Sequence, residues 1–174
     1  MKIGLVLLVA ASVVLTGCAS GVTRAPSSPT AQAVRPVNPV VSAVSTSFTD
    51  DGKAAASENL KFNADELRSH VKRALEANSL LNGKTDSAAP ELEIRIKGVR
   101  VRSNFSAVMW GIMAGSDYIT ADVVLKDAAG KEIDKYEVSV SYGLGGLAGG
   151  QDTTRMGWLY EKFAEETVKE LKRP

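Results

Sequence analysis

Residues 1–17 are not expected to form part of the folded domain, so they determine where the folding part of the chain can begin. Met1-Lys2 supplies one positive charge, and residues 3–15 form an apolar run interrupted only by Gly4 and Ser12. A short basic end followed by an apolar stretch of about 7–15 residues is typical of a secretory signal. The run is shorter than the roughly 20 residues that a helix needs to cross a bilayer. We therefore predict that residues 1–17 are a signal peptide, removed before the rest of the chain folds.

The last residues of this segment indicate the kind of signal. Leu15-Thr16-Gly17-Cys18 has the lipobox order of a branched apolar residue, two small residues and cysteine. Cleavage between Gly17 and Cys18 would expose a thiol that can accept lipid as a thioether. A buried structural cysteine is the alternative, but Cys18 is the only cysteine and directly follows the signal. We expect covalent lipid on Cys18, no other cofactor, and anchoring to a membrane through the acyl chains.

The composition of the mature chain narrows the possible partners. Without Lys2, the 21 basic residues fall to 20 and balance the 20 acidic ones. A neutral exported chain lacks the basic footprint of nucleic-acid binding. Residues 18–39 contain four prolines among small residues, which favours a flexible, extended tether. The alanine at position 19, in place of an aspartate, favours the periplasmic face of the outer membrane in enteric-type sorting.

Residues 40–174 are predicted to form a single domain. Residues 64–81 form an amphipathic helix, with Asn63 as its cap and Glu66 closing a capping box. Residues 91–102 alternate as a strand until Gly98, where the phase changes as a β-bulge would produce. Further strands are predicted at 40–48, 118–126 and 131–142, with a hairpin turn at 127–130, a turn at 49–52, and a final helix at 154–172 capped by Asp152 or Thr153. The predicted fold is α+β, a four-stranded mainly antiparallel sheet with two helices on one face, in the order β-α-β-β-β-α.

A glycine-rich stretch lies before the last helix. Its glycines are Gly143, Gly145, Gly146, Gly149 and Gly150. The spacing formally fits a dinucleotide-binding fingerprint, but no second strand with an acidic residue follows. A phosphate-binding P-loop is excluded because Gln151-Asp152 stands where Lys-Ser/Thr is required. We expect no nucleotide and interpret the stretch as a flexible or tightly turning loop; close approach to a partner, or weak anion binding near Arg155, are the alternatives.

A second unusual stretch, residues 105–115, joins two predicted strands. Connections are usually polar, whereas this one is almost wholly apolar. It either folds back onto the core or exposes an apolar surface for a protein partner, a lipid or the membrane. Trp158, on the side of the last helix opposite Phe163, is either another contact residue or a cover for the glycine loop. The possible contact residues are therefore Phe105, Met109, Trp110, Ile112, Met113 and Trp158.

The sequence contains no recognisable catalytic or metal-binding arrangement. His70 flanks the apolar face of its helix, where a lone histidine is usually structural. Asp50, Asp51, Asp117 and Asp122 lack the spacing of metal ligands, and no nucleophile elbow or triad accompanies the serines. The basic strand residues Arg95, Lys97, Arg100 and Arg102 are explained as a solvated sheet face paired across strands with Asp122 and Glu137. We expect a protein that is not an enzyme.

The order of these features resembles a known family. The lipobox, the helix after Asn63, the Leu92–Val101 strand, the Asp117-Tyr-Ile-Thr-Ala-Asp-Val hairpin and the glycine stretch are similar to small bacterial lipoproteins of the domain-of-unknown-function 4410 type. More loosely, they resemble YajG-type lipoproteins. The resemblance implies an envelope lipoprotein and no catalytic residues. The expected function is protein binding or a structural accessory role in the cell envelope; the alternatives are a carrier or transport-auxiliary subunit for a lipid-like ligand and, less favoured, an envelope hydrolase.

Overall fold

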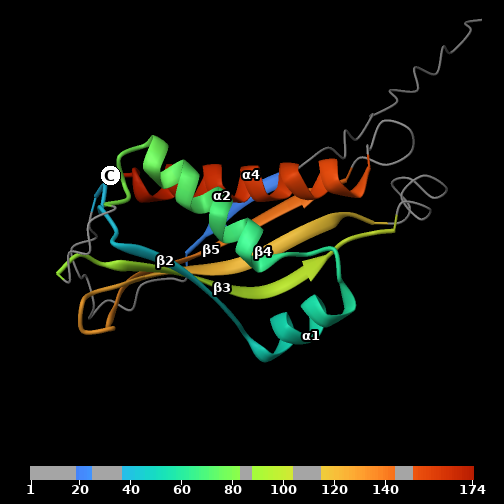
Figure 1. The fold of residues 1–174 in the computed structure, drawn as a ribbon, viewed down its shortest axis with the longest axis horizontal. Helices are drawn as coiled ribbons and strands as arrows, with labels where there is room; N and C mark the ends of the chain where they lie inside the picture. Colours follow the sequence, from blue (N-terminus) through green and yellow to red (C-terminus); the bar gives the residue numbers. More distant parts are fainter. Residues whose placement is uncertain (1–18, 25–36, 83–87, 104–114, 144–150) are drawn as a thin grey trace, which may run out of the picture.

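The computed structural model describes residues 19–24, 37–82, 88–103, 115–143 and 151–174. These residues form an α+β fold in which a mixed five-stranded sheet is covered on one face by two helices (Figure 1). The strands are β1 Ala19–Thr23, β2 Ala43–Phe48, β3 Glu91–Arg100, β4 Asp117–Lys126 and β5 Glu132–Tyr142, in the spatial order β1-β5-β4-β3-β2. The helices are α1 Asp50–Glu58, α2 Ala64–Ala77 and α4 Asp152–Leu171.

The predicted α+β class and the antiparallel β3-β4-β5 meander are confirmed. The predicted bulge lies between Ile96 and Gly98. The hairpin turn places Gly130 at φ 80°, in the left-handed region that glycine occupies without steric cost. Strand β2 pairs parallel to β3, because the helical connection between them crosses back over the sheet before β3 begins.

The predicted four-stranded sheet was wrong by one strand. Residues 19–23, assigned to the flexible tether, form β1 and pair antiparallel with β5 from Ala19↔Ser141 to Thr23↔Glu137. Small polar residues and nearby prolines dominate this part of the sequence, so its composition resembles a linker. The exposed edge of β5 offers unpaired backbone groups, and β1 satisfies them.

The prediction of two helices was wrong as well, because the expected turn at 49–52 begins α1. The Thr49 hydroxyl accepts a hydrogen bond from the Gly52 amide, and Asp50 and Asp51 lie in the positively polarised first turn. Helix α1 packs against β3 beyond the end of β2. There the Asn59 side chain donates to the Val99 carbonyl and accepts from the Val101 amide. Helix α1 therefore protects the edge of β3 that β2 leaves uncovered.

The two covering helices differ from their predicted ends. Helix α2 stops at Ala77 instead of residue 81, because Ser79 adopts φ 58° and Leu80 turns back to bond Leu75 O. Helix α4 begins after Gln151, which makes no side-chain cap. The predicted cap Asp152 is in the first turn, where ion pairs engage its carboxylate.

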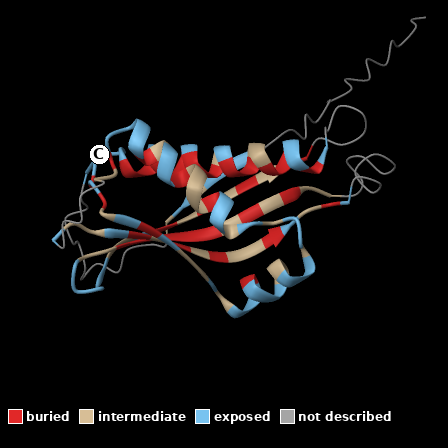
Figure 2. Cartoon of the chain, in the orientation of Figure 1, coloured by how far each residue is buried: buried red, intermediate tan, exposed pale blue. Residues whose placement is uncertain are grey.

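The core lies between the sheet and helices α2 and α4. Buried residues line the side of α4 that faces the sheet (Figure 2). Alternation along the strands turns one set of apolar side chains toward these helices. The fully buried members include Leu67, Val71, Leu75, Leu92, Ile94, Ile96, Ile119, Val123, Val138, Val140, Leu159 and Phe163.

Candidate functional site

One end of the sheet gathers the sequence features singled out above. Ala19, Ser141, Tyr118 and Arg100 stand in one row across β1, β5, β4 and β3. The described residues that flank the apolar and glycine-rich stretches lie beyond this row: Ser103, Gly115, Gly143 and Gln151. We call this the loop end of the domain. Ala19 is the first residue of β1, so this strand begins at the loop end.

A buried ion network organises the loop end. Asp117, with no exposed area, accepts hydrogen bonds from the Arg102 backbone amide at 2.6 Å and from Arg155 Nε at 2.7 Å. Arg102 Nε also lies 3.2 Å from Asp117 Oδ1. The Arg102 guanidinium donates to the Gly115 and Tyr142 carbonyls at 2.5 and 3.2 Å. One carboxylate and one guanidinium thus tie together the ends of β3, β4 and β5.

Arg155 connects this network to helix α4. Its guanidinium, also without exposed area, donates to the Arg102 carbonyl at 2.8 Å and to Asp152 Oδ1 at 2.7 Å. Lys61, which precedes α2, pairs with the other Asp152 oxygen. Breaking a buried ion pair typically costs about 3–5 kcal/mol because a charge is left uncompensated. The network therefore fixes the flanks of both unusual loops relative to the sheet.

The network corrects two sequence interpretations. Arg102 was assigned to a solvated basic face, but it is 3% exposed. The chain leaves the strand after Arg100, so alternation no longer determines which way Arg102 points. Arg155 was a remote candidate for anion binding, but its guanidinium is occupied by Asp117 and Asp152. The i,i+3 spacing of Asp152 and Arg155 was the one local signal of this arrangement.

The cross-strand pairing predicted for Lys97 is confirmed. Lys97 Nζ lies 2.6 Å from Glu137 and 3.3 Å from Asp122, across the neighbouring strands. Arg95 pairs with Glu93 at 2.9 Å on its own strand and with Glu132 of β5 at 3.5 Å. The Lys97 contacts and the Arg95–Glu132 contact are the cross-strand pairs expected of a solvated sheet surface.

Most residues of the predicted sites lie outside the described residues. They are the cleavage and lipidation residues Gly17 and Cys18, the possible contact residues Phe105, Met109, Trp110, Ile112 and Met113, and the loop glycines Gly145, Gly146, Gly149 and Gly150. Gly143 is described and buried. Trp158 is partly buried at the loop end, where its ring meets the edge of Tyr142 at 5.2 Å. Its partner role stays a prediction.

Leu60 is an exposed apolar residue that the sequence analysis did not single out. It is 91% exposed in the connection between α1 and α2. Its neighbours fix its place, because Asn59 bonds Val99 and Val101 while Lys61 pairs with Asp152. Leu60 therefore projects from the loop end. Its only signal in the sequence was an apolar side chain just before the predicted helix at 64–81.

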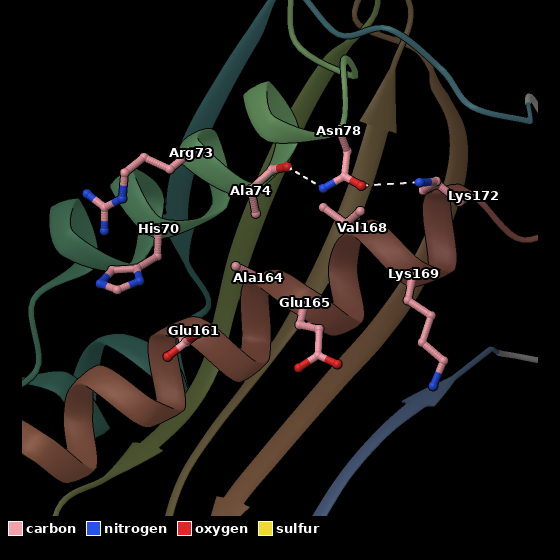
Figure 3. Close-up of a pocket in the computed structure, with 10 residues that line it drawn as sticks. All are labelled: His70, Arg73, Ala74, Asn78, Glu161, Ala164, Glu165, Val168, Lys169 and Lys172. Atoms are coloured by element: carbon pink, nitrogen blue, oxygen red, sulfur yellow. Dashed lines mark hydrogen bonds between the residues drawn. The ribbon is translucent and has the colours of Figure 1, made fainter.

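A surface groove of about 870 Å³ lies along the junction of α2 and α4 (Figure 3). His70 and Arg73 border it from α2, and Glu161, Glu165 and Lys169 from α4. Burial, with a smaller contribution from Arg73, lowers the pKa of His70. The His70 ring packs at 5.6 Å from the Tyr160 ring. This packing agrees with the structural role that the sequence predicted for His70.

Within the described ranges, no cluster of three or more His, Cys, Asp and Glu residues is arranged to hold a metal ion. No helix among the described residues has the length and apolar character needed to cross a membrane.

The described residues form a small α+β domain with an ion-paired loop end. A match between the sequence and a family model shows the family to which the chain belongs. The model of the family described as a domain of unknown function, DUF4410, matches residues 25–146. The chain belongs to this family, which confirms the resemblance inferred from its motifs. No curated protein matches the chain significantly.

Solved structures of other proteins also match the chain, among them the following two. The PelC dodecamer from Paraburkholderia phytofirmans is 11% identical, with a TM-score of 0.47, and the match covers 90% of this chain and 99% of that one. A minor lipoprotein from Acinetobacter baumannii is 13% identical, with a TM-score of 0.47, over 77% of this chain and 92% of that one.

Proposed function

We propose that this protein is a non-enzymatic lipoprotein of the cell envelope, held through acylated Cys18 with its loop end against the membrane. The observation that carries the proposal is that β1 begins at Ala19, in the row of residues that borders the loop end. Consecutive Cα atoms are about 3.8 Å apart. Acyl chains on Cys18 would therefore enter the bilayer close to this end.

Two features support a contact surface at the loop end. Leu60 exposes its side chain there, and the chain between Ser103 and Gly115 contains Phe105, Met109 and Trp110. Apolar side chains held beside a lipid anchor suit a protein partner that is itself at the membrane. The buried network supports this role, because it holds the flanks of both stretches in place relative to the sheet. Within the cell envelope, we propose that the protein is anchored at the periplasmic face of the outer membrane.

A carrier function has less support. It requires space for a ligand between the sheet and the helices. In the described part of the chain, Leu92, Ile94 and Phe163 occupy this interface with no exposed area. We therefore place the contact surface outside the core.

Replacement of Cys18 tests the anchor. The wild type should fractionate with membranes, and its N-terminal peptide should carry the mass of acyl chains on Cys18. The N-terminal peptide of Cys18→Ala should carry no acyl chains, and any fraction of this variant whose signal is cleaved elsewhere should be soluble. An unmodified Cys18 in the membrane-extracted wild type would contradict the proposal.

Replacement of Leu60 tests the contact surface. Leu60→Ser leaves the core intact and should reduce site-specific cross-linking from the loop end to a membrane protein partner at least several-fold. Phe48→Ser is the matched control, since Phe48 is 41% exposed at the β2 edge. Equal cross-linking by wild type and Leu60→Ser, or an equal loss in both variants, would count against the loop end as the contact.

A further inference from the structure

The N-terminal strap, residues 19–24, is attached to the domain with little apolar burial. Ala19, Ser20, Gly21 and Thr23 are exposed, and only Val22 packs against the core. A Cβ on Gly21 would meet no atom within 4 Å. Segments with few buried apolar contacts open at low free-energy cost. The strap therefore differs from the central strands, which the core holds in place.

Polar contacts at both ends of the strap replace the missing apolar ones. The Ser20 hydroxyl donates to Glu166 at 2.8 Å. Arg24 donates to Asp134 at 2.6 Å and to Glu170 at 2.7 Å. The Arg24 guanidinium also lies 4.9 Å from the centre of the Tyr136 ring. Arg24 is the one strap residue that joins β5 and α4 through charged groups.

The surface beneath the strap suits reversible attachment. Glu166 and Glu170 of α4 are 6% and 4% exposed while the strap covers them. A cleft of about 510 Å³ remains between the strap and α4, bordered by Ser20, Gly21, Val22, Glu166, Lys169, Glu170 and Arg173. Release of the strap would hydrate carboxylates instead of exposing a large apolar area. Water solvates carboxylates well, so the opened surface carries no strong hydrophobic penalty.

We propose that the strap is a releasable device that sets how far the domain stands from the membrane, an inference that rests on the proposed lipid anchor at Cys18. With the strap attached, the loop end lies beside the acyl chains. With the strap released, the first fixed point is near Asn38, whose amide bonds the Leu171 carbonyl. The residues between Cys18 and Asn38 would then allow a separation of up to about 60 Å, at roughly 3.1 Å per residue. Attached and released straps correspond to a short and a long reach.

Hydrogen exchange of the mature protein tests whether the Arg24 contacts hold the strap on the domain. Arg24→Ala should raise amide exchange in residues 19–24 about tenfold or more and leave β4 unchanged. Arg173→Ala is the matched control, because Arg173 also pairs with Glu170, at 3.6 Å, but with a 69% exposed side chain. Exchange of the strap in Arg24→Ala equal to wild type would overturn the proposal. An equal rise in β4 would also overturn it, since the strap would then open only with the whole domain.

A second measurement separates this inference from the proposed anchor. The lipidated protein is placed in phosphatidylethanolamine–phosphatidylglycerol vesicles that contain a lipid-borne quencher, with a fluorophore attached at Ser103→Cys. Arg24→Ala should show weaker quenching than Arg173→Ala. If Cys18 carries lipid but Arg24→Ala and Arg173→Ala are quenched equally, the proposed release of the strap is wrong and the lipid anchor is upheld. If Cys18 carries no lipid, the anchor fails, and the exchange result still decides whether the strap opens.

Discussion

At the scale of single residues, Asp117 has the largest structural role at the loop end. It is fully buried, and both carboxylate oxygens accept from arginine donors. A buried carboxylate is costly unless it is paired and hydrogen-bonded. Here Arg102 and Arg155 compensate the negative charge of Asp117. The same contacts hold the ends of β3, β4 and β5 and helix α4 together.

Asp117→Asn tests this role. The amide removes the charge and turns a donor toward Arg102 and Arg155, so the two buried guanidiniums lose the carboxylate that they share. We expect the free energy of unfolding to fall by about 3–5 kcal/mol, measured by urea denaturation. Glu165→Gln is the control, because the Glu165 side chain is 60% exposed and pairs with Lys162 at the surface. That variant should change stability by less than about 1 kcal/mol, and an equal loss in both variants would contradict the assigned role.

Sequence patterns did not reveal this network, for a physical reason. Alternation along a strand tells which face a residue occupies only while the strand continues. Arg102 and Asp117 lie on either side of the connection between β3 and β4, where alternation has ended or has just begun. Asp117 also pairs with Arg155 of helix α4, a contact between distant parts of the chain that strand alternation does not encode. Lys97 and Glu137, within the strands, were placed correctly.

At the scale of elements, helix α1 depends on a glycine. A Cβ at Gly52 would lie 2.0 Å from the Ile96 carbonyl oxygen. The helix can approach the β3 backbone only because position 52 carries no side chain. The sequence signals for this helix were present in Thr49 and the two following aspartates, but glycine beside them is equally typical of a turn.

Gly52→Ala should therefore destabilise the protein by about 1–3 kcal/mol, since backbone must move to accommodate the methyl group. Gly157→Ala is the matched control within α4, where an added Cβ meets no atom within 4 Å. That replacement should stabilise the protein by up to about 1 kcal/mol through helix propensity. Thermal unfolding of both variants measures the difference. A rise in Tm for Gly52→Ala would show that α1 does not pack closely on β3.

The N-terminal strap shows a second limit of sequence reading at this scale. The five residues of β1, in which Val22 is the one large apolar side chain, carry almost no strand pattern, and the prolines that follow resemble a linker. Its pairing with β5 follows from the unpaired edge of that strand, which is a property of the assembled sheet. The meander, in contrast, was predicted because its alternation and turn residues are local.

At the scale of the whole molecule, the sheet face opposite α2 and α4 links stability to pH through Glu93. Burial raises the pKa of this carboxyl, but Lys126, Ser47 and Arg95 together lower it to about 2. The folded protein therefore keeps Glu93 ionised at pH values where the unfolded chain, with a pKa near 4.5, becomes protonated. This stabilisation is fully present above pH 4.5 and is lost as pH falls toward 2.

Comparison of wild type with Glu93→Gln isolates this contribution. The stability difference between the two proteins should shrink by roughly 2 kcal/mol from pH 6 to pH 3, because each pKa unit corresponds to about 1.4 kcal/mol. Urea denaturation at a series of pH values measures it. A difference that stays constant across this range would show that Glu93 is not held in its ionised form by these contacts.

The proposed lipid anchor at Cys18 also determines which end of the domain we expect to face the membrane. Ala19, the first residue of β1, lies at the loop end, whereas the β4–β5 hairpin at Ala129 lies at the opposite end of the sheet. Ten residues of β4 separate these ends, which corresponds to about 33 Å along a strand. An acylated Cys18 does not react with thiol reagents, so one added cysteine can carry a fluorophore at either end.

The most direct measurement compares quenching of these two labels by lipid-borne quenchers, in vesicles that carry the lipidated protein. We expect a label at Ser103→Cys to be quenched strongly and a label at Ala129→Cys to be quenched weakly. Equal quenching, or stronger quenching at Ala129→Cys, would contradict an account in which Cys18 and β1 hold the loop end against the membrane.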